Sequence, residues 1–381
     1  MAGPLSGIRI LDLSTVIAGP YATQVLGDMG AEILKIEPPQ GDIMRAPGPG
    51  RSAGMGATFL NCNRNKRSIV LDLKQAQDHD ALMDMVGEAQ VVVHNMRPAA
   101  AARLGLTYDD MRARNPSIIF CAIVGYGQQG VYRDRPAYDD VIQAAAGWAG
   151  MEQRMGGEPR YAPTIVADKT TGLYVVAAVN AALFHRAQTG QGQYVEVPMF
   201  EVMASFLLVD QLGGRSFVPP EGPPGYSRLL SPHRRPHRTR DGYLSVLPYT
   251  GAHWKRFFEL AGRQDWADDA RLDSNDQRAA MVDDLYTRLA QILVSRSSAE
   301  WMEVLPQADI PCSPVNSVDD LLQDEHLRSV EFFMESDHPT EGRVLTTRPP
   351  VHFSSTPCGV QALAPALQVQ KPEPSNVDFI P

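Results

Sequence analysis

The N-terminal part of the chain alternates strand and helix signals in a way that leaves few folds open. Residues 8–13 (IRILDL) predict a buried strand, residues 20–29 a helix with Pro20 in its first turn, and residues 31–36 (AEILKI) a second strand. This order predicts a parallel sheet, because the helix carries the chain back across the sheet. Similar signals follow, with strands expected at 68–72, 90–94, 117–124 and 193–197 and helices at 75–87, 108–114, 139–149, 168–186 and roughly 199–212. We therefore expect an α/β fold.

The amino-acid composition of the chain changes after the last of these helices. Residues 213–241 are rich in Gly, Pro, Arg and His, which is typical of a long linker or lid. Residues 242–247 predict a strand that opens a second, smaller unit, with helices near 252–262 and 275–296. Residues 340–353 indicate paired strands. The length of 381 residues also favours two or three domains.

Composition excludes several classes of protein. Lys and Arg number 35 and Asp and Glu 44, so the net charge is −9, which argues against a nucleic-acid-binding protein. Four cysteines without a CxxC pair indicate reduced thiols, and nine histidines without ligand spacing predict no metal site. Neither a signal peptide nor a long apolar span is indicated. We expect a cytoplasmic protein that binds no membrane.

One glycine motif invites a dinucleotide interpretation. Residues 125–130 (GYGQQG) match GxGxxG and follow a predicted strand. A dinucleotide fingerprint needs that loop to open directly into a helix whose N-terminus holds the pyrophosphate. Here Pro136 lies where such a helix would be fully formed, so we expect a turn near an active site instead.

Asp168 is the main candidate for chemistry. It lies in IVADKTTGLYVV, directly before a predicted helix rich in small apolar residues. One interpretation is an N-cap, in which the carboxylate accepts backbone N–H groups. The other is a nucleophile, which must be ionised, and a helix N-terminus would keep it so. The two interpretations are compatible. The small residues of the helix permit close packing, including packing across a subunit interface.

Basic clusters give a weaker signal. Arg64, Lys66 and Arg67 precede a predicted strand and fit either a solvated loop or a phosphate contact. Arg97, Arg103 and the run from Arg234 to Arg240 are open to the same two interpretations.

The order of these motifs resembles the class III CoA-transferase family, which includes formyl-CoA and carnitine-type CoA-transferases and the related α-methylacyl-CoA racemases. The resemblance covers nearly the whole chain. It rests on PLSGIRILDLSTVIAGPYATQVLGDMGAEILKIEPPQGDIMR (4–45), NRNKRSIVLDLK (63–74), VVHNMRP (92–98), residues 115–147, ADKTTG (167–172), TGQGQYVEVPMFE (189–201), IPCSPVNSVDDLL (310–322) and GRVLTTRPPVHFSSTP (342–357).

The resemblance implies a large Rossmann-like domain and a smaller α+β domain, in an interlocked homodimer of intertwined rings. The expected division is 1–200 for the first part of the CoA-binding domain, 201–241 for a linker, 242–325 for the small domain, and 326–381 for a linker and the return to the large domain. It implies Asp168 as the catalytic residue. The positions that would contact coenzyme A are Val16, Leu71, Lys74, Asn95, Met96, Arg103 and Tyr138.

The implied function is transfer of CoA from an acyl-CoA to a carboxylic acid, through an acyl-aspartyl anhydride and an aspartyl-CoA thioester on Asp168. The chain departs from formyl-CoA transferases at Ile17, where they carry glutamine, and in lacking a clear polyglycine loop. Oxalate is therefore disfavoured as the acceptor, because an apolar Ile17 would leave its charge unpaired.

Two alternatives remain. A 2-methylacyl-CoA racemase of the same fold needs a base on each face of the α-carbon. The racemase histidine falls at Tyr138 and the racemase glutamate near Gly251, and tyrosine is a poor base at neutral pH. The second alternative is a CoA-binding protein without activity, against which Asp168 argues.

Overall fold

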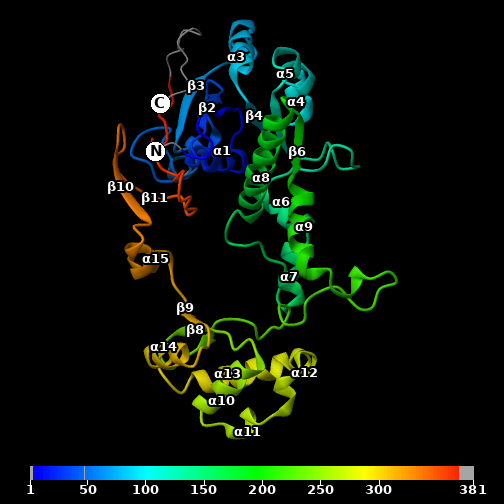
Figure 1. Cartoon of the computed structure of the whole chain (residues 1–381), viewed down its shortest axis with the longest axis vertical. Coiled ribbons are helices and arrows are strands. Elements are labelled where there is room, and N and C mark those ends of the chain that lie inside the picture. The colour runs from blue at the N-terminus through cyan, green and yellow to red at the C-terminus, as the bar shows by residue number, and fades with distance from the viewer. Residues whose placement is uncertain (1–2, 47, 369–381) are drawn as a thin grey trace. The chain divides into compact units, whose positions relative to one another are not determined.

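A six-stranded parallel sheet forms the centre of the larger of two compact units. A computed structural model describes residues 3–46 and 48–368 of the chain. The spatial order of the strands is β3-β2-β1-β4-β5-β6, and Figure 1 labels β3, β2, β4 and β6 of this sheet. Because the order reverses after β3, the C-terminal ends of β1 and β4 flank a topological switch point, where open α/β sheets bind ligands. The strands are β1 (Arg9–Asp12), β2 (Glu32–Glu37), β3 (Lys66–Val70), β4 (Val91–His94), β5 (Ile119–Val124) and β6 (Tyr194–Pro198).

Helices cover this sheet, which explains why its central strands are mostly apolar. Every residue of β4 and β5 is buried. A Cβ at Gly172 would lie 2.8 Å from the carbonyl oxygen of Ala18, so glycine permits α1 and α8 to approach closely. The helices are α1 (Ala18–Asp28), α2 (Ala57–Cys62), α3 (Ala76–Glu88), α4 (Pro98–Arg103), α5 (Tyr108–Arg114), α6 (Asp139–Ala145), α8 (Val166–Thr189), the start of α9 (Met199–Gln211) and α16 (Glu325–Ser329).

The larger unit is built from the described residues of three separate stretches of chain, 3–147 (without residue 47), 161–206 and 325–368. The third stretch carries an antiparallel hairpin of β10 (Phe333–His338) and β11 (Gly342–Thr347). It is joined to the sheet region by Arg64, which donates from Nη1 to the carbonyl oxygen of Thr347 at 2.7 Å. The C-terminal stretch is therefore part of the same core.

The smaller unit comprises residues 148–160 and 207–324. Its core is aromatic, with Trp254, Phe257 and Trp301 buried, and the indole nitrogen of Trp301 donates to the carbonyl oxygen of Leu293 at 2.8 Å. A small antiparallel sheet joins β7 (His237–Arg238), β8 (Tyr243–Val246) and β9 (Cys312–Pro314). The helices are α7 (Trp148–Arg154), α10 (Gly251–Leu260), α11 (Gln264–Ala267), α12 (Asn275–Ala280), α13 (Val282–Leu293), α14 (Ser298–Gln307) and α15 (Val318–Gln323).

The predicted α/β class is confirmed, and three predicted elements were wrong in detail. The helix expected over 139–149 is two helices, because Gly147 adopts a left-handed φ of 92° between α6 and α7. The helix expected over 275–296 breaks at Met281. The hairpin pairs Phe333–His338 with Gly342–Thr347, so its first strand precedes the predicted region.

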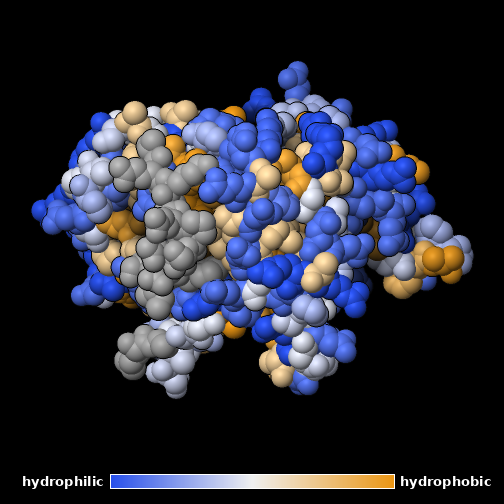
Figure 2. All heavy atoms as spheres, turned by 90° about the horizontal axis from the view of Figure 1, so that it is seen from above, coloured by the Kyte–Doolittle hydropathy of each residue, from blue (hydrophilic) through white to orange (hydrophobic). Residues whose placement is uncertain are grey.

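The face of the molecule in Figure 2 is mostly hydrophilic, with smaller groups of apolar residues between the polar ones. Within residues 3–46 and 48–368, no helix combines the length and apolar character needed to cross a membrane.

Candidate active site

A pocket of about 440 Å³ lies at the topological switch point of the sheet. It is lined by the segments that follow β1, β4 and β5, and Asp168 also lines it. Asn95 joins two of these segments, because its side-chain oxygen accepts from the Thr15 N–H at 3.0 Å and its nitrogen donates to the Thr15 carbonyl at 2.7 Å. Two hydrogen bonds from one amide fix the loops after β1 and β4 relative to each other.

The backbone at Val16 is strained. Its φ of 70° lies in the left-handed region, which a β-branched residue rarely adopts. The Val16 N–H donates to Oδ1 of Asp42 at 3.2 Å, and Asp42 forms a buried ion pair with Lys35 at 2.9 Å. Lys35 also donates to the carbonyl oxygen of Ser14 at 2.8 Å. The buried pair therefore holds the pocket loop in a conformation that its sequence alone disfavours.

A further buried ion pair lies beneath the same loop. Lys66 Nζ lies 2.9 Å from Asp12 Oδ2, and both side chains are fully buried. Burial alone would raise the pKa of Asp12, but Lys66 and Lys35 hold it well below its usual range. Burial lowers the pKa of Lys66 to about 8, against the attraction of Asp12. Asp12 is therefore ionised at neutral pH.

These contacts correct the prediction for the basic cluster. Arg64 is 6% exposed and binds Asp28 through two hydrogen bonds, Nε to Oδ1 at 2.9 Å and Nη2 to Oδ2 at 2.7 Å. Lys66 is in β3 and not in a loop. The interpretation as a solvated loop is wrong for Arg64 and Lys66, whose charges are paired inside the fold.

Asp168 is the third residue of α8 and is 9% exposed. Its own backbone N–H and that of Ala167 both donate to Oδ1 of Asp139, at 3.0 and 2.8 Å. The N-cap interpretation of Asp168 is therefore wrong. The side chain that satisfies these helix N–H groups comes from Asp139, at the start of α6, and Asp168 is left to line the pocket.

The capping carboxylate is itself fixed by α6. Gln143, one turn after Asp139, donates from Nε2 to Asp139 Oδ2 at 2.5 Å and accepts the Ala162 N–H at 2.8 Å. Burial, followed by the repulsion of Asp139, raises the pKa of Asp168 to about 7. The expectation that a cap position keeps Asp168 fully ionised is thus also wrong, because the cap is a second carboxylate and it opposes ionisation.

The pocket brings together five of the eight predicted site residues. Besides Asp168 these are Val16, Asn95, Met96 and Tyr138. The other three do not line it. Leu71 is buried in the core against which Met96 also packs, Lys74 is exposed between β3 and α3, and Arg103 is exposed at the end of α4.

The loop between β5 and α6 supplies residues that the sequence analysis did not select. Gly125, Gln128, Arg133 and Arg135 all line the pocket. The N–H groups of Gly127 and Gln128 donate to Glu201 and Glu196, each at 2.9 Å, and no helix follows before Asp139. The loop therefore lacks the helix that a dinucleotide fingerprint needs, and it forms part of the wall of the candidate pocket. The sequence analysis did not place the rest of this loop next to Asp168, and it therefore missed these pocket residues.

Ile17 is 3% exposed and does not line the pocket. The argument against an oxalate acceptor assumed contact with this side chain, and that premise is wrong. Three cationic side chains lie on the pocket wall, Arg97, Arg133 and Arg135.

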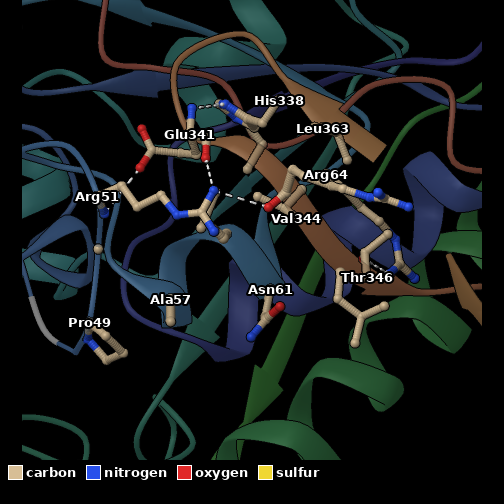
Figure 3. Close-up of a pocket in the computed structure, with 15 residues that line it drawn as sticks. Pro49, Arg51, Ala57, Asn61, Arg64, His338, Glu341, Val344, Thr346 and Leu363 are labelled. Atoms are coloured by element: carbon tan, nitrogen blue, oxygen red, sulfur yellow. Dashed lines mark hydrogen bonds between the residues drawn. The ribbon is translucent and has the colours of Figure 1, made fainter. Parts of the chain in front are cut away.

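A second pocket, of about 390 Å³, is lined by the loop before α2 and by the β10–β11 hairpin. Figure 3 shows Arg51 between Glu341 and the hairpin backbone, to which it is hydrogen bonded. The carboxylate of Glu341 accepts the N–H groups of Arg51 and Ser52, and His338 contacts the carbonyl oxygen of Ala364 at 2.7 Å. These polar groups stabilise the hairpin. Among the described residues, no cluster of His, Cys, Asp and Glu could hold a metal ion.

Comparison with known proteins assigns the chain to a family. Residues 5–370 match the profile of CoA-transferase family III. The chain belongs to CoA-transferase family III. It is therefore an enzyme that transfers CoA between an acyl-CoA and a carboxylate, and the resemblance stated from the sequence is confirmed.

Several named relatives of this family III enzyme cover most of its length. Succinate–glutarate CoA-transferase of Agrobacterium fabrum is 31% identical over 377 residues, which are 96% of this chain and 93% of that protein. The beta subunit of succinyl-CoA–L-malate CoA-transferase of Chloroflexus aurantiacus is 31% identical over 96% of this chain and 91% of its own.

Solved structures show the same fold. The crystal structure of Rv3272 from Mycobacterium tuberculosis matches with a TM-score of 0.83 and 28% identity, over 96% of this chain and 97% of that one. A CAIB/BAIF family protein from Brucella suis matches with a TM-score of 0.82 and 28% identity, over the same shares.

Proposed function

We propose that this family III enzyme moves CoA from an acyl-CoA to a carboxylic acid through covalent intermediates on Asp168. The observation that carries the proposal is the position of Asp168: a buried carboxylate on the wall of the pocket at the switch point, where α/β sheets bind ligands. A carboxylate that has lost part of its hydration is a stronger nucleophile than one in water.

The proposed chemistry has four steps. Asp168 attacks the acyl carbonyl, which breaks the thioester, forms an acyl-aspartyl anhydride and releases CoA thiolate. The thiolate attacks the aspartyl carbonyl, giving an aspartyl-CoA thioester and the free donor acid. The acceptor carboxylate attacks that thioester, giving a new anhydride and CoA thiolate. The thiolate finally attacks the acceptor's acyl carbon, which yields the new acyl-CoA and restores Asp168.

The other predicted site residues have different proposed roles in this scheme. Val16, Asn95, Met96 and Tyr138 line the same pocket and are proposed to contact CoA near its thiol end. Leu71, Lys74 and Arg103 lie outside it and are proposed to bind the nucleotide end. Asp139 is a positioning residue, because it holds the first turn of α8 and touches Asp168 only through the backbone.

The nature of the acceptor is proposed from charge and from the names of relatives. Arg133 and Arg135 line the pocket. The two relatives named above act, according to their names, on succinate, glutarate or malate. A short dicarboxylate is therefore the proposed acceptor class, with succinyl-CoA as the first donor to test.

We also propose the interlocked homodimer that the sequence resemblance implies. Its support is an exposed apolar stripe on α8, formed by Leu173, Ala177, Ala181 and Phe184 at helical spacing. A stripe with small residues at its middle suits close packing against a second helix.

The test of the mechanism is to trap the intermediate. The enzyme is incubated with succinyl-CoA, treated with hydroxylamine and digested, and the peptide that carries Asp168 is weighed by mass spectrometry. We expect an aspartyl hydroxamate at Asp168 in the wild type and in Asp140→Asn, a neighbouring exposed carboxylate, and none in Asp168→Asn. A hydroxamate at another residue, or transfer without any adduct, contradicts the proposal. Uptake of deuterium at the α-carbon of a chiral 2-methylacyl-CoA, with no acceptor acid present, would indicate the racemase.

A further inference from the structure

A buried glutamine of α6 joins the segments that meet at the start of α8. Gln143 is fully buried, and its side-chain oxygen accepts the Ala162 N–H at 2.8 Å. Because this oxygen faces a donor, the orientation of the amide is fixed, and Nε2 is the atom that donates to Asp139 Oδ2 at 2.5 Å. The same nitrogen lies 3.5 Å from the carbonyl oxygen of Thr164. Gln143 therefore ties the capping carboxylate to the chain that leads into α8.

The two carboxylates at this helix start differ in the number of donors that they meet. Asp139 accepts three hydrogen bonds, from the N–H groups of Ala167 and Asp168 at Oδ1 and from the amide of Gln143 at Oδ2. The carboxylate of Asp168 accepts none from the residues that the structure describes. Donated hydrogen bonds stabilise the ionised form of a carboxylate, and two neighbouring carboxylates compete for one proton. The proton that the pair holds therefore belongs on Asp168.

Only one of the three donors to Asp139 is a side chain. The two N–H groups at Oδ1 belong to the backbone of α8, whereas the donor to Oδ2 is the amide of Gln143. Asp139 is 7% exposed, so without this amide Oδ2 would be a buried acceptor with no donor among the described residues. A proton could then bind at Oδ2. A change at Gln143 therefore alters the charge beside Asp168 without a change to either carboxylate.

Other ionisable groups near α8 leave this relation to Asp139 intact. The elements packed against α8 are α1, α6, β5 and β6, and besides Asp139 they carry the ionisable side chains Tyr21, Asp28, Asp140, Cys121, Tyr194 and Glu196. On α8 itself, Lys169 donates to the hydroxyl of Thr164 at 2.6 Å. The three arginines of the pocket wall are exposed. Burial, followed by the charge of Asp139, is what raises the pKa of Asp168.

We propose that Gln143 is a positioning residue for CoA transfer, because its amide keeps Asp139 as the ionised member of the pair and so directs the shared proton to Asp168. Gln143 does not line the pocket and acts only through Asp139. It thereby sets the pH at which Asp168 becomes available for attack. The inference rests on the proposed role of Asp168 as the nucleophile.

Two substitutions of Gln143 test the proposal through the pH profile of transfer. Gln143→Met keeps the size of the side chain and removes the donor, so Asp139 can take up a proton and its charge no longer opposes ionisation of Asp168. We expect kcat/KM at pH 6, relative to the plateau, to rise about two- to three-fold over wild type. Gln143→Glu leaves at least one negative charge on the pair of carboxyls formed with Asp139, so its profile should stay in place or move to higher pH.

Gln24→Met is the matched control. Gln24 is a buried glutamine of α1 whose side-chain oxygen accepts a backbone N–H, that of Arg64, at 3.1 Å. It has no hydrogen bond to Asp139 or Asp168. We expect this variant to lose stability and to keep the wild-type pH profile, which separates damage to packing from the effect on charge.

Carbon-13 NMR of enzyme labelled at the aspartate carboxyls follows the proton directly. The signals of Asp139 and Asp168 are assigned by their absence in Asp139→Asn and Asp168→Asn. In the wild type, Asp168 should titrate between pH 5.5 and pH 8 while Asp139 stays at its ionised position. In Gln143→Met the midpoint of Asp168 should fall, and in Gln143→Glu and Gln24→Met it should not.

The proposal is overturned if Gln143→Met keeps the wild-type midpoint of Asp168, or if Gln143→Glu or Gln24→Met lowers that midpoint as well. It is also overturned if Asp139 takes up the proton in the wild type, and this measurement decides if neither Gln143 variant folds. The midpoint does not depend on which residue is the nucleophile. If it moves as expected and kcat/KM does not follow, or if no hydroxamate forms at Asp168, the assignment of the nucleophile fails instead.

Discussion

At the scale of the residue, the main finding is that two carboxylates share the start of α8. Asp139 caps the helix and Asp168 lines the pocket, and burial together with the charge of Asp139 raises the pKa of Asp168. An aspartate whose pKa is about 7 is partly protonated at neutral pH. A proposed nucleophile of this kind gains reactivity from burial, and in return only a fraction of the molecules is ionised at any time.

This predicts how transfer depends on pH. Because Asp168 must be ionised to attack, kcat/KM for succinyl-CoA should rise with pH and level off above about 7, and at pH 6 it should be about a tenth of the plateau. Asp139→Asn keeps an oxygen for the helix N–H groups and removes the charge, so its pH profile should move to lower pH. A kcat/KM that is constant from pH 5.5 to pH 8 would contradict the assignment.

The raised pKa of Asp168 predicts that a variant without this carboxylate is more stable than the wild type. A carboxyl whose pKa is raised on folding contributes stability that is present at low pH and is lost as pH rises through about 7. Because the pKa of Asp168 rises from 3.8 to about 7 on folding, the lost stability amounts to at most about 4 kcal/mol. Asp168→Asn should therefore melt at a higher temperature than wild type at pH 8.5, and the difference should shrink towards pH 5. Asp140→Asn, at an exposed position, should show no such pH-dependent difference.

At the scale of the element, β1, β2 and β3 carry buried charges near the switch point. Lys35 and Asp12 both contact Ser14 in the loop after β1, and Lys66 pairs with Asp12. The strands could be predicted from their apolar runs, and the helices from their spacing and caps. The ion pairs could not be predicted, because Asp12 and Lys66 are far apart in the sequence and only the strand order brings them together.

Two lysine variants distinguish a lysine that stabilises the fold from one that is proposed to bind CoA. Lys66→Ala leaves Asp12 without its partner inside the protein, which should lower the free energy of unfolding by about 3–5 kcal/mol. Lys74→Ala, at an exposed site, should change it by less than about 0.5 kcal/mol and instead weaken CoA binding if Lys74 contacts the nucleotide. Urea unfolding and CoA titration on both variants check this. Equal stability of the two variants would show that the buried pair contributes little to the free energy of unfolding.

At the scale of the whole molecule, the sequence could predict the elements but not the contacts between distant ones. The α/β unit followed from its alternating strands and helices. The role of Asp139 did not, since its partners Ala167 and Asp168 lie in another helix and the contact forms only after α6 and α8 have packed. Gln143 was not selected either, because no sequence pattern reports which carboxylate a buried amide binds. Local patterns thus predict elements, and contacts between distant segments decide the site.

The proposed homodimer belongs to this scale. Phe184→Glu places a charge on the exposed stripe of α8 and should shift the protein towards monomer or aggregate in light scattering coupled to size-exclusion chromatography. His185→Glu, exposed one position along and off the stripe, should remain dimeric. If the rings are interlocked, tagged and untagged dimers mixed in native buffer should not exchange subunits until they are unfolded and refolded. Free exchange in native buffer would show a dimer without interlocking.

The three-part construction of the larger unit bears on how the chain is made on the ribosome. Arg64 and Asn65 emerge early, but their partners at Thr347 and Gly359 are added almost at the end of synthesis. The smaller unit lies wholly between these points, in residues 148–160 and 207–324, so its sequence is complete while the larger one still lacks its last stretch. At roughly 5–20 residues per second, the nascent α/β core must wait for many seconds with a side open. We therefore expect the larger unit to depend more on chaperones during translation than the smaller unit.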